Sequence, residues 1–258
     1  TSNANGLGVD LVCADNYTTI GQGASDCRNA HGEATWAVVS DERVKKDIED
    51  ATVGLAFIND LRPVTFNYKN KRYRNQEELK LYNIIGYLEG NEKKDEIVVI
   101  SAHYDHLGMK STGSGDLIFN GANDNATGVA AVLTLAEHFK SKNNNSRSIL
   151  FIAFTAEEMG LVGSNYFGKT ISAESIVAGI NIEMIGKESP FGPNTAWLTG
   201  FQRSNFGKII QKNLSSSEFK IYPDPFISYR LFFRSDNASF ARLGIPAHTF
   251  STSPMDKD

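Results

Sequence analysis

The chain has 258 residues, of which 41% are hydrophobic and 22% are charged, and its net charge is −4. This length suffices for one large domain or two small ones, and the composition is that of an ordinary globular protein. The small negative charge gives no electrostatic support for binding nucleic acid or an anionic membrane, so we expect no nucleic-acid partner. No apolar run approaches the length of a membrane span, so we expect no membrane-spanning segment.

The first seventy residues differ in texture from the rest. Residues 1–35 are rich in Gly, Asn, Asp and Thr, which predicts short β pieces and turns. Residues 40–61 have helical spacing, and residues 64–68 alternate like a strand before the strongly polar run 69–80. We therefore predict a small α+β segment over residues 1–72 and a separate domain over 73–258.

The only two cysteines, Cys13 and Cys27, both lie in the N-terminal segment. Two cysteines are not a disulfide framework, so free thiols are favoured and a single disulfide stays the alternative. Residues 1–10 show no basic region followed by an apolar core, so no signal peptide is visible.

From Leu81 onward, strand patterns alternate with helix patterns. Ile97 to Ala102 is an uninterrupted apolar run, typical of a strand that is covered on both faces. We predict strands at 84–88, 97–102, 149–154, 180–184 and 245–250, and helices beginning near Asn125, at Glu157 and at Phe206. This order predicts an α/β fold with a sheet between helices.

Residue types that bind metals follow three of the buried strands. They are His103 and Asp105 after the first, Glu157 and Glu158 after the second, and Glu183 at the end of the third; Asp124 lies in a Gly/Asn-rich turn between them. Zinc favours imidazole nitrogen and carboxylate oxygen in catalytic sites. Ligands gather at the carboxyl ends of strands in α/β proteins, so the pattern predicts a metal centre there.

Most of these residues also have a simpler explanation; Glu183 is the hardest to dismiss, because a carboxylate in an apolar strand needs compensation. His103 and Asp105 share a face of an extended chain, and such a pair is often only structural; as a metal site, Asp105 would receive the second ring N–H of His103. Asp124 alone is a helix cap or turn residue, and Glu157 with Glu158 is a charged first helical turn. Only the combination and its order favour a metal site.

The motifs resemble the zinc-dependent aminopeptidase superfamily, which includes glutamate carboxypeptidases and glutaminyl cyclases. The resemblance covers residues 83–258 and rests on four segments: 101–108, 120–128, 153–164 and 181–186. It implies a three-layer α/β/α sandwich around a mostly parallel mixed sheet.

The resemblance also implies a role for each residue. His103 and Glu183 would bind one zinc, Glu158 a second, and Asp124 both; Glu157 would be the general base. The implied reaction is hydrolysis of N-terminal residues from peptides, in a secreted or periplasmic protein.

The chain departs from the superfamily's pattern in two places. The family usually has Asp where Glu183 stands, and its histidine for the second zinc comes in a loop after the last strand, before a closing helix. The chain ends at Asp258 without that histidine or helix, and His248 lies inside the last predicted strand. We therefore expect a fold truncated at its C-terminus, an incomplete second zinc site and impaired activity. His106 is given no role beyond that of a loop residue.

The segment from Ser40 to Ile48, together with Leu61 to Asn67, resembles a different family. This family is the self-cleaving intramolecular chaperone at the end of phage tail spikes. The chain contains only an incomplete piece of that chaperone. Carried over, Ser40 and Lys45 would form a serine–lysine dyad that cleaves the chain before Ser40. A charged helix start capped by Ser40 explains the same residues.

Three functions stay open. The leading hypothesis is a zinc aminopeptidase, with glutaminyl cyclase or carboxypeptidase as alternatives on the same fold. The second is a phage tail structural or chaperone protein that cleaves itself once. The third is an inactive relative that uses the fold for binding. The aromatic residues that are candidate pocket walls are Phe191, Trp197, Phe226, Tyr229, Phe232 and Phe233.

Overall fold

The structure is a computed structural model, which describes residues 10–12, 17–21, 27–30, 37–38, 62–68 and 79–255, with side chains from residue 80. The chain divides into two compact units, Thr1–Thr52 and Val53–Asp258. The first unit contains an antiparallel sheet in the order β1 (Asp10–Val12), β2 (Tyr17–Gly21), β3 (Cys27–Ala30) and β4 (Ala37–Val38). These strands agree with the β pieces predicted for this region.

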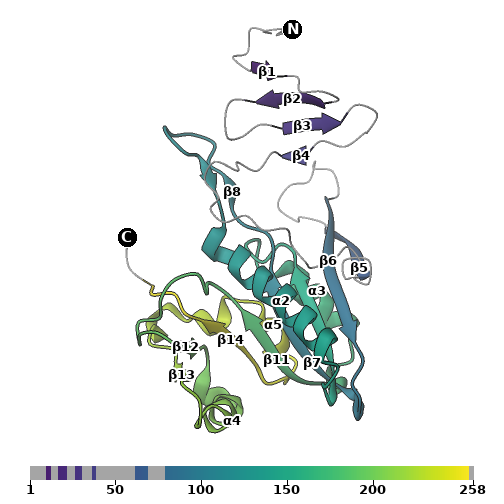
Figure 1. The fold of residues 1–258 in the computed structure, drawn as a ribbon, viewed down its shortest axis with the longest axis vertical. Helices are drawn as coiled ribbons and strands as arrows, with labels where there is room; N and C mark the ends of the chain where they lie inside the picture. The colour runs from purple at the N-terminus through teal and green to yellow at the C-terminus, as the bar shows by residue number, and fades with distance from the viewer. Residues whose placement is uncertain are drawn as a thin grey trace. The chain divides into compact units, whose positions relative to one another are not determined.

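The second unit is built on an eight-stranded mixed sheet (Figure 1). Its spatial order is β13-β12-β14-β11-β7-β10-β6-β5. The strands are β5 (Arg62–Tyr68), β6 (Leu79–Leu88), β7 (Lys93–His103), β10 (Arg147–Phe154), β11 (Ile176–Ile182), β12 (Thr195–Leu198), β13 (Lys220–Pro223) and β14 (Ala247–Ser251). Strands β10, β7, β11 and β14 are parallel to one another, and β12 is parallel to β13, whereas the β5–β6, β6–β10 and β12–β14 pairs are antiparallel. The predicted mixed, mostly parallel sheet is confirmed.

Strand β5 comes from the segment that the sequence pattern assigned to the N-terminal part. In the structure it pairs antiparallel with β6 from Arg62↔Ile85 to Tyr68↔Leu79. The predicted boundary between residues 72 and 73 lies outside the described residues and stays a prediction.

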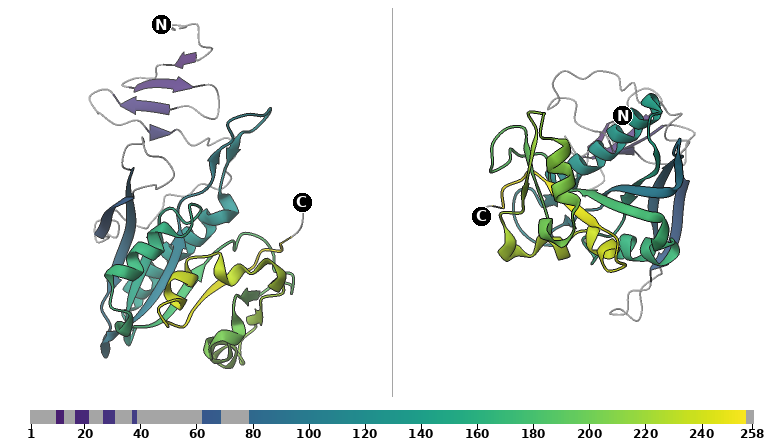
Figure 2. Two further views of the ribbon diagram at one scale, coloured as in Figure 1. Left: turned by 180° about the vertical axis from the view of Figure 1, so that it is seen from behind. Right: turned by 90° about the horizontal axis from the view of Figure 1, so that it is seen from below.

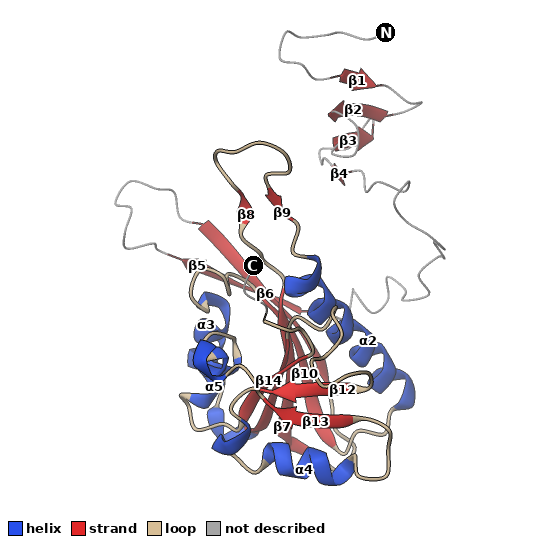
Figure 3. Ribbon diagram, turned by 90° about the vertical axis from the view of Figure 1, so that its left-hand side faces the viewer, coloured by secondary structure: helices blue, strands red, loops and turns tan. Residues whose placement is uncertain are grey.

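Helices cover both faces of the sheet, which confirms the three-layer sandwich. Helix α2 (Thr127–Lys142) lies on one side, and α3 (Val162–Thr170) and α5 (Asn237–Ala241) lie on the other (Figure 3). The views in Figure 2 show the same arrangement from behind and from below. Helix α4 (Phe206–Asn213) packs beside the short strands β12 and β13.

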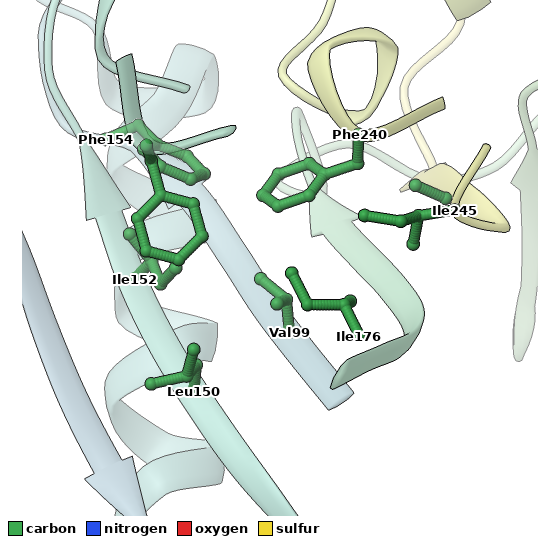
Figure 4. Close-up of a cluster of buried hydrophobic side chains, with 9 residues drawn as sticks. Val99, Leu150, Ile152, Phe154, Ile176, Phe240 and Ile245 are labelled. Carbon is green, nitrogen blue, oxygen red and sulfur yellow. The ribbon is translucent and has the colours of Figure 1, made fainter. Parts of the chain in front are cut away.

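Alternating side chains explain why the central strands are apolar throughout. Val99, Leu150, Ile152 and Phe154 point to the α3 and α5 side, where they meet Phe167 and Phe240 of those helices (Figure 4). The intervening residues, Ile100, Ala102, Ile149 and Phe151, pack against Val132 and Ala136 of α2. A strand that is buried on both faces has apolar residues at successive positions, without the alternation of polar and apolar residues.

One predicted helix start is wrong. The sequence pattern placed a helix beginning at Glu157, but α3 begins at Val162. Ala156, Gly160 and Leu161 have φ values of 53°, 98° and 60°, which a right-handed helix does not allow. Residues 155–161 instead form a tight loop at the end of β10, and this loop carries Glu157 and Glu158.

Short elements connect the main ones. A two-stranded pair, β8 (Gly108–Met109) and β9 (Ile118–Phe119), follows β7, and a distorted turn, η3 (Ala122–Ala126), leads into α2. The remaining short helical turns are η4 (Ala173–Ser175), η5 (Phe201–Arg203), η6 (Ile227–Tyr229) and η7 (Leu231–Phe233). Within the described part of the chain, no helix is both long and apolar enough to cross a membrane.

Candidate metal centre

The predicted ligands meet because three neighbouring strands are parallel. Strand β7 lies between β11 and β10, and its last residue, His103, is in register with Phe154 at the end of β10. Glu183 directly follows β11, and Glu157 and Glu158 lie in the loop after β10. The carboxyl ends of the three strands therefore deliver these side chains to one edge of the sheet.

His103, Asp124 and Glu183 form the first of two clusters with metal-binding geometry. One ligand atom from each lies within 4.8 Å of the others. His103 Nε2 and Asp124 Oδ1 are 3.1 Å apart and buried, yet neither has a hydrogen-bond partner of acceptable geometry. Two atoms that bind one zinc ion at about 2 Å lie about 3 Å apart, so these unpaired atoms fit a shared cation.

The tautomer of His103 suits this role. Its Nδ1 lies 3.0 Å from the backbone oxygen of Asp105, and a carbonyl oxygen only accepts hydrogen bonds, so Nδ1 carries a proton. Nε2 of the neutral ring then keeps its lone pair free toward Asp124. A hydrogen bond at the opposite ring nitrogen is the usual way to orient a histidine ligand.

The carboxylate of Asp105 makes a different contact from the one predicted. It lies 3.8 Å from His103 Nδ1 and accepts hydrogen bonds from the backbone N–H groups of Glu157 and Glu158, at 3.0 and 3.2 Å. The backbone of Asp105 therefore orients His103, while its side chain fixes the loop that carries the two glutamates. A side chain two residues along a strand was expected to share the histidine's face, but the chain turns after His103.

Asn125 holds the turn that carries Asp124. It is buried, and the peptide bond that joins it to Asp124 is cis. Its amide donates to Ile182 O at 3.0 Å, and its Oδ1 accepts from the N–H groups of Gly128 and Met184, each at 3.2 Å. These bonds tie the η3 turn to the end of β11, so Asp124 and Glu183 are positioned together.

The second cluster contains His106, which the sequence pattern indicated only as a loop residue. His106, Asp124 and Glu158 each offer a ligand atom within 4.8 Å of the others. His106 Nδ1 lies 2.8 Å from Glu158 Oε1, and both side chains are about four-fifths buried, with 20% and 21% exposed. Asp124 belongs to both clusters, as the bridging role predicted for it requires.

Burial and neighbouring charge perturb the acids around the clusters. Burial, followed by the charges of Glu183 and Asp236, raises the pKa of Glu157 from 4.5 to about 9. Burial also raises the pKa of Glu183. So much negative charge in a buried place is stable only with protons or cations bound.

Asp236 is a second residue that the sequence analysis did not assign. It is fully buried, and both carboxylate oxygens lack a hydrogen-bond partner of acceptable geometry. Burial raises its pKa to about 7, although Ser164 and His103 beside it act in the opposite direction. Residues 234–247 resemble the superfamily's late segment, and this resemblance was the sequence signal that could have identified Asp236.

His103 responds to the same charges in the opposite sense. Burial lowers its pKa, but the carboxylates of Asp124, Glu183, Glu157 and Asp236 outweigh that effect and raise it to about 10. The site thus stabilises positive charge at the position of the His103 ring. A divalent cation beside Nε2 supplies that charge without a proton.

An open hollow of about 390 Å³ lies beside the glutamates. Glu157 and Glu158 form part of its wall, together with Gly160, Leu161, Phe233, Arg234 and Arg242. Of the aromatic residues expected to line a pocket, Phe233 lies on this hollow and is 43% exposed, whereas Trp197 is 1% exposed and belongs to the core.

His248 is a buried residue of β14, as the sequence pattern predicted. Its Nδ1 donates to Thr199 O at 2.8 Å, and its Nε2 lies 2.6 Å from Ser204 Oγ. Both ring nitrogens are therefore occupied away from the two clusters. Ser40, Lys45 and Cys13 lie outside the described residues, as does the side chain of Cys27, and the serine–lysine dyad and the free thiols stay predictions.

Two protein-family models match the chain. Peptidase family M28 matches residues 83–258, and the chaperone of endosialidase matches residues 40–86. The two matches overlap at residues 83–86, within β6. Both resemblances drawn from the sequence are thereby confirmed.

Individual aminopeptidases and zinc metalloproteases are also similar to this chain, over part of their length. Aminopeptidase YwaD of Bacillus subtilis is 34% identical over 122 residues, which are 46% of this chain and 24% of that protein. A "Probable zinc metalloprotease" of Pyricularia oryzae is 33% identical over 113 residues, 43% of this chain and 22% of its own. The match thus spans about a quarter of each relative.

Among solved structures, an aminopeptidase from Aneurinibacillus sp. strain AM-1 superposes with a TM-score of 0.52 at 25% identity. The superposition covers 69% of this chain and 40% of that one.

Proposed function

Because this chain belongs to peptidase family M28, we propose that it is a zinc-dependent aminopeptidase that uses two zinc ions. The observation that carries the proposal is the pair of histidine–carboxylate clusters that share Asp124, with the buried Glu157 beside them. The aminopeptidase activity named for YwaD supports the choice of reaction.

The donor set fits zinc. Each cluster offers one imidazole and two carboxylates, which are ligand types that zinc takes in catalytic sites while keeping a further position open. His103 and Glu183 would hold one ion, Glu158 the other, and Asp124 both. The buried, unpaired His103 Nε2 and Asp124 Oδ1 support the first of these sites directly.

Zinc in these sites supplies polarisation of the scissile carbonyl and a more acidic attacking water. Glu157 accepts a proton from that water and delivers it to the departing amine. Because its pKa is about 9 without a cation, Glu157 is a carboxylate near neutral pH only when positive charge is bound beside it. Asp105 holds Glu157 in place through the backbone N–H at 3.0 Å.

The substrate is a peptide with a free N-terminus, which we place in the hollow beside Glu157. Phe233 forms an apolar part of its wall. A secreted or periplasmic location is the one that the superfamily resemblance implies, and it remains part of the proposal.

Hydrolysis of a panel of aminoacyl-p-nitroanilides tests this function. We expect release of p-nitroaniline that a chelator abolishes and zinc restores, and no release from the N-acetylated versions of the same substrates. Substrates with N-terminal glutamine separate the alternatives, because a glutaminyl cyclase produces pyroglutamate and an aminopeptidase produces free glutamine. Cleavage of N-blocked peptides from their C-terminus would replace the proposal with a carboxypeptidase.

For the N-terminal segment we propose a single self-cleavage before Ser40, with Lys45 as the base. The match of the endosialidase chaperone to residues 40–86 supports this assignment. Intact mass after expression tests it: cleavage gives a chain that begins at Ser40, and Ser40→Ala keeps the full mass. A full-length mass for the unaltered chain contradicts it.

A further inference from the structure

His106 lies beside Asp124 and Glu158 in the second cluster, where each of the three offers a ligand atom within 4.8 Å of the others. It belongs to the stretch between β7 and β8, three residues after the first-site ligand His103. We propose that His106 is a ligand of the second zinc ion, together with Glu158 and the bridging Asp124. This inference rests on the proposed function for the presence of zinc, and it gives a metal-binding role to a histidine that was expected to be only a loop residue.

The surroundings of His106 hold its ring at the second cluster. Phe119 meets the ring edge-on, with 6.2 Å between ring centroids and 81° between the planes. His106 also packs against Gly121, where a Cβ atom would come within 3.1 Å of His106 Cβ and 3.2 Å of its Cγ. Gly121 precedes the turn that carries Asp124, so the histidine packs against the same segment that supplies the bridging carboxylate.

A structural hydrogen bond to Glu158 is the simpler explanation of His106. It accounts for the 2.8 Å contact of Nδ1 with Glu158 Oε1, but it does not explain why Asp124 also converges on this pair. Two carboxylates held together repel each other unless a positive charge lies between them. A cation bound by all three groups removes that repulsion and uses every one of them.

The contact between His106 and Glu158 can change from a hydrogen bond to joint binding of a cation. The neutral ring has one proton; when that proton moves from Nδ1 to Nε2 by exchange with solvent, the Nδ1 lone pair faces the cation and no net proton is released. Two ligand atoms on one zinc ion are about 3 Å apart, so the 2.8 Å contact needs only a small opening to admit the ion. The result repeats the first cluster, with one imidazole and two carboxylates.

Zinc titration of the 258-residue chain tests the inference, with His106→Gln as the variant. Glutamine still hydrogen-bonds Glu158 but is a poor zinc ligand. We expect two zinc ions per unaltered chain. In the variant we expect one tight ion and a second-site affinity lower by about 100-fold or more. Mutating a residue that only hydrogen-bonds to a zinc ligand already lowers metal affinity by about 10–100-fold, and losing a ligand should cost more. His138→Gln, at an exposed histidine on α2, is the matched control and should bind two ions.

X-ray absorption at the zinc edge separates a ligand from a positioning residue. The zinc-saturated chain should show about one imidazole per zinc, and saturated His106→Gln about half of that. Thermal unfolding and the first-site affinity of the variant show that it is folded. An unchanged second-site affinity or an unchanged imidazole count in the variant overturns the inference, as does a single zinc in the unaltered chain.

The outcomes also separate this inference from the proposed function. Two zinc ions that depend on His106, without hydrolysis of any peptide, support the ligand and contradict the aminopeptidase. If His106→Gln keeps both zinc ions and zinc-dependent hydrolysis, the aminopeptidase is supported and the ligand role of His106 is contradicted.

Discussion

At the level of single residues, metal ligands could be predicted where a histidine or carboxylate residue lies at the end of a buried strand. His103 and Glu183 could be predicted because strand ends are fixed by local pattern, and parallel strands bring their ends together. His106 could not, because its partner Glu158 lies more than fifty residues away and the loop that joins them to Asp124 has no sequence period. The contact of the Asp105 side chain was also beyond prediction, since it depends on the turn after His103.

Asp124 is the residue whose loss should affect both metals. In Asp124→Asn the neutral side chain no longer offsets the charge of either cation, so we expect affinity at both sites to fall by at least about 10–100-fold. Zinc content per chain, measured after dialysis, checks this. Asp116→Asn, an exposed aspartate in the loop before Asn120, is the control and should keep its zinc. Full zinc content in Asp124→Asn would exclude the bridging role.

At the scale of elements, the strands were predicted more accurately than the loops. The apolar run at 97–102 corresponds to β7, and the helix expected from Phe206 corresponds to α4. The error at Glu157 has a physical cause: the loop after β10 has positive φ at Ala156 and Leu161, and neither residue type indicates positive φ in a sequence. The short strands β12 and β13 carried too few residues for a visible period.

The start of α2 should be sensitive to a single methyl group. A Cβ atom on Gly128 would lie 2.3 Å from Asn125 Oδ1 and 2.4 Å from Ile182 O, in the network that positions Asp124. We expect Gly128→Ala to lower the free energy of unfolding by about 1–3 kcal/mol and to weaken zinc binding at both sites. Denaturant unfolding and zinc titration measure the two effects.

Gly168→Ala is the matched control for this substitution. Its Cβ would lie 3.1 Å from the flexible Leu243 side chain and 4.0 Å, an ordinary van der Waals distance, from Ser239 O, so stability should be nearly unchanged. Equal stability of the two alanine variants would show that the turn before α2 tolerates the change and that the Asn125 network is not tight.

At the scale of the whole molecule, the sequence indicated two unlike parts, and two family models match the chain. What it could not give is the electrostatic state of the site, which arises only when the fold gathers Glu157, Glu183 and Asp236 around His103. All four groups have raised pKa values, so the folded chain holds extra protons when no metal is bound.

This excess of protons predicts how stability depends on pH. The pKa values of Glu157 and Asp236 rise from 4.5 and 3.8 to about 9 and about 7, and that of His103 from 6.5 to about 10. Between those unfolded and folded values the folded chain binds more protons than the unfolded chain, so its stability falls as pH rises. With a chelator present, we expect the Tm to decrease from about pH 5 to about pH 9.

Zinc should flatten this dependence, because the cation favours charged carboxylates and a neutral imidazole. Thermal unfolding followed by circular dichroism, with chelator or with zinc, provides the comparison. Glu157→Gln should reduce the slope of the chelated protein, since one of the titrating acids is gone. A chelated protein whose Tm rises over this pH range would contradict the charge balance described for the site.

Glu157→Gln is the most direct test of Glu157 as the general base of a zinc peptidase. The amide keeps the size of the side chain but cannot take a proton, so hydrolysis of an aminoacyl-p-nitroanilide, normalised to bound zinc, should fall by about 10²–10⁴-fold. Zinc content should stay at the level of the unaltered chain, whereas Glu158→Gln should lose zinc. A Glu157→Gln variant that hydrolyses the substrate at the unaltered rate would show that Glu157 is not the general base.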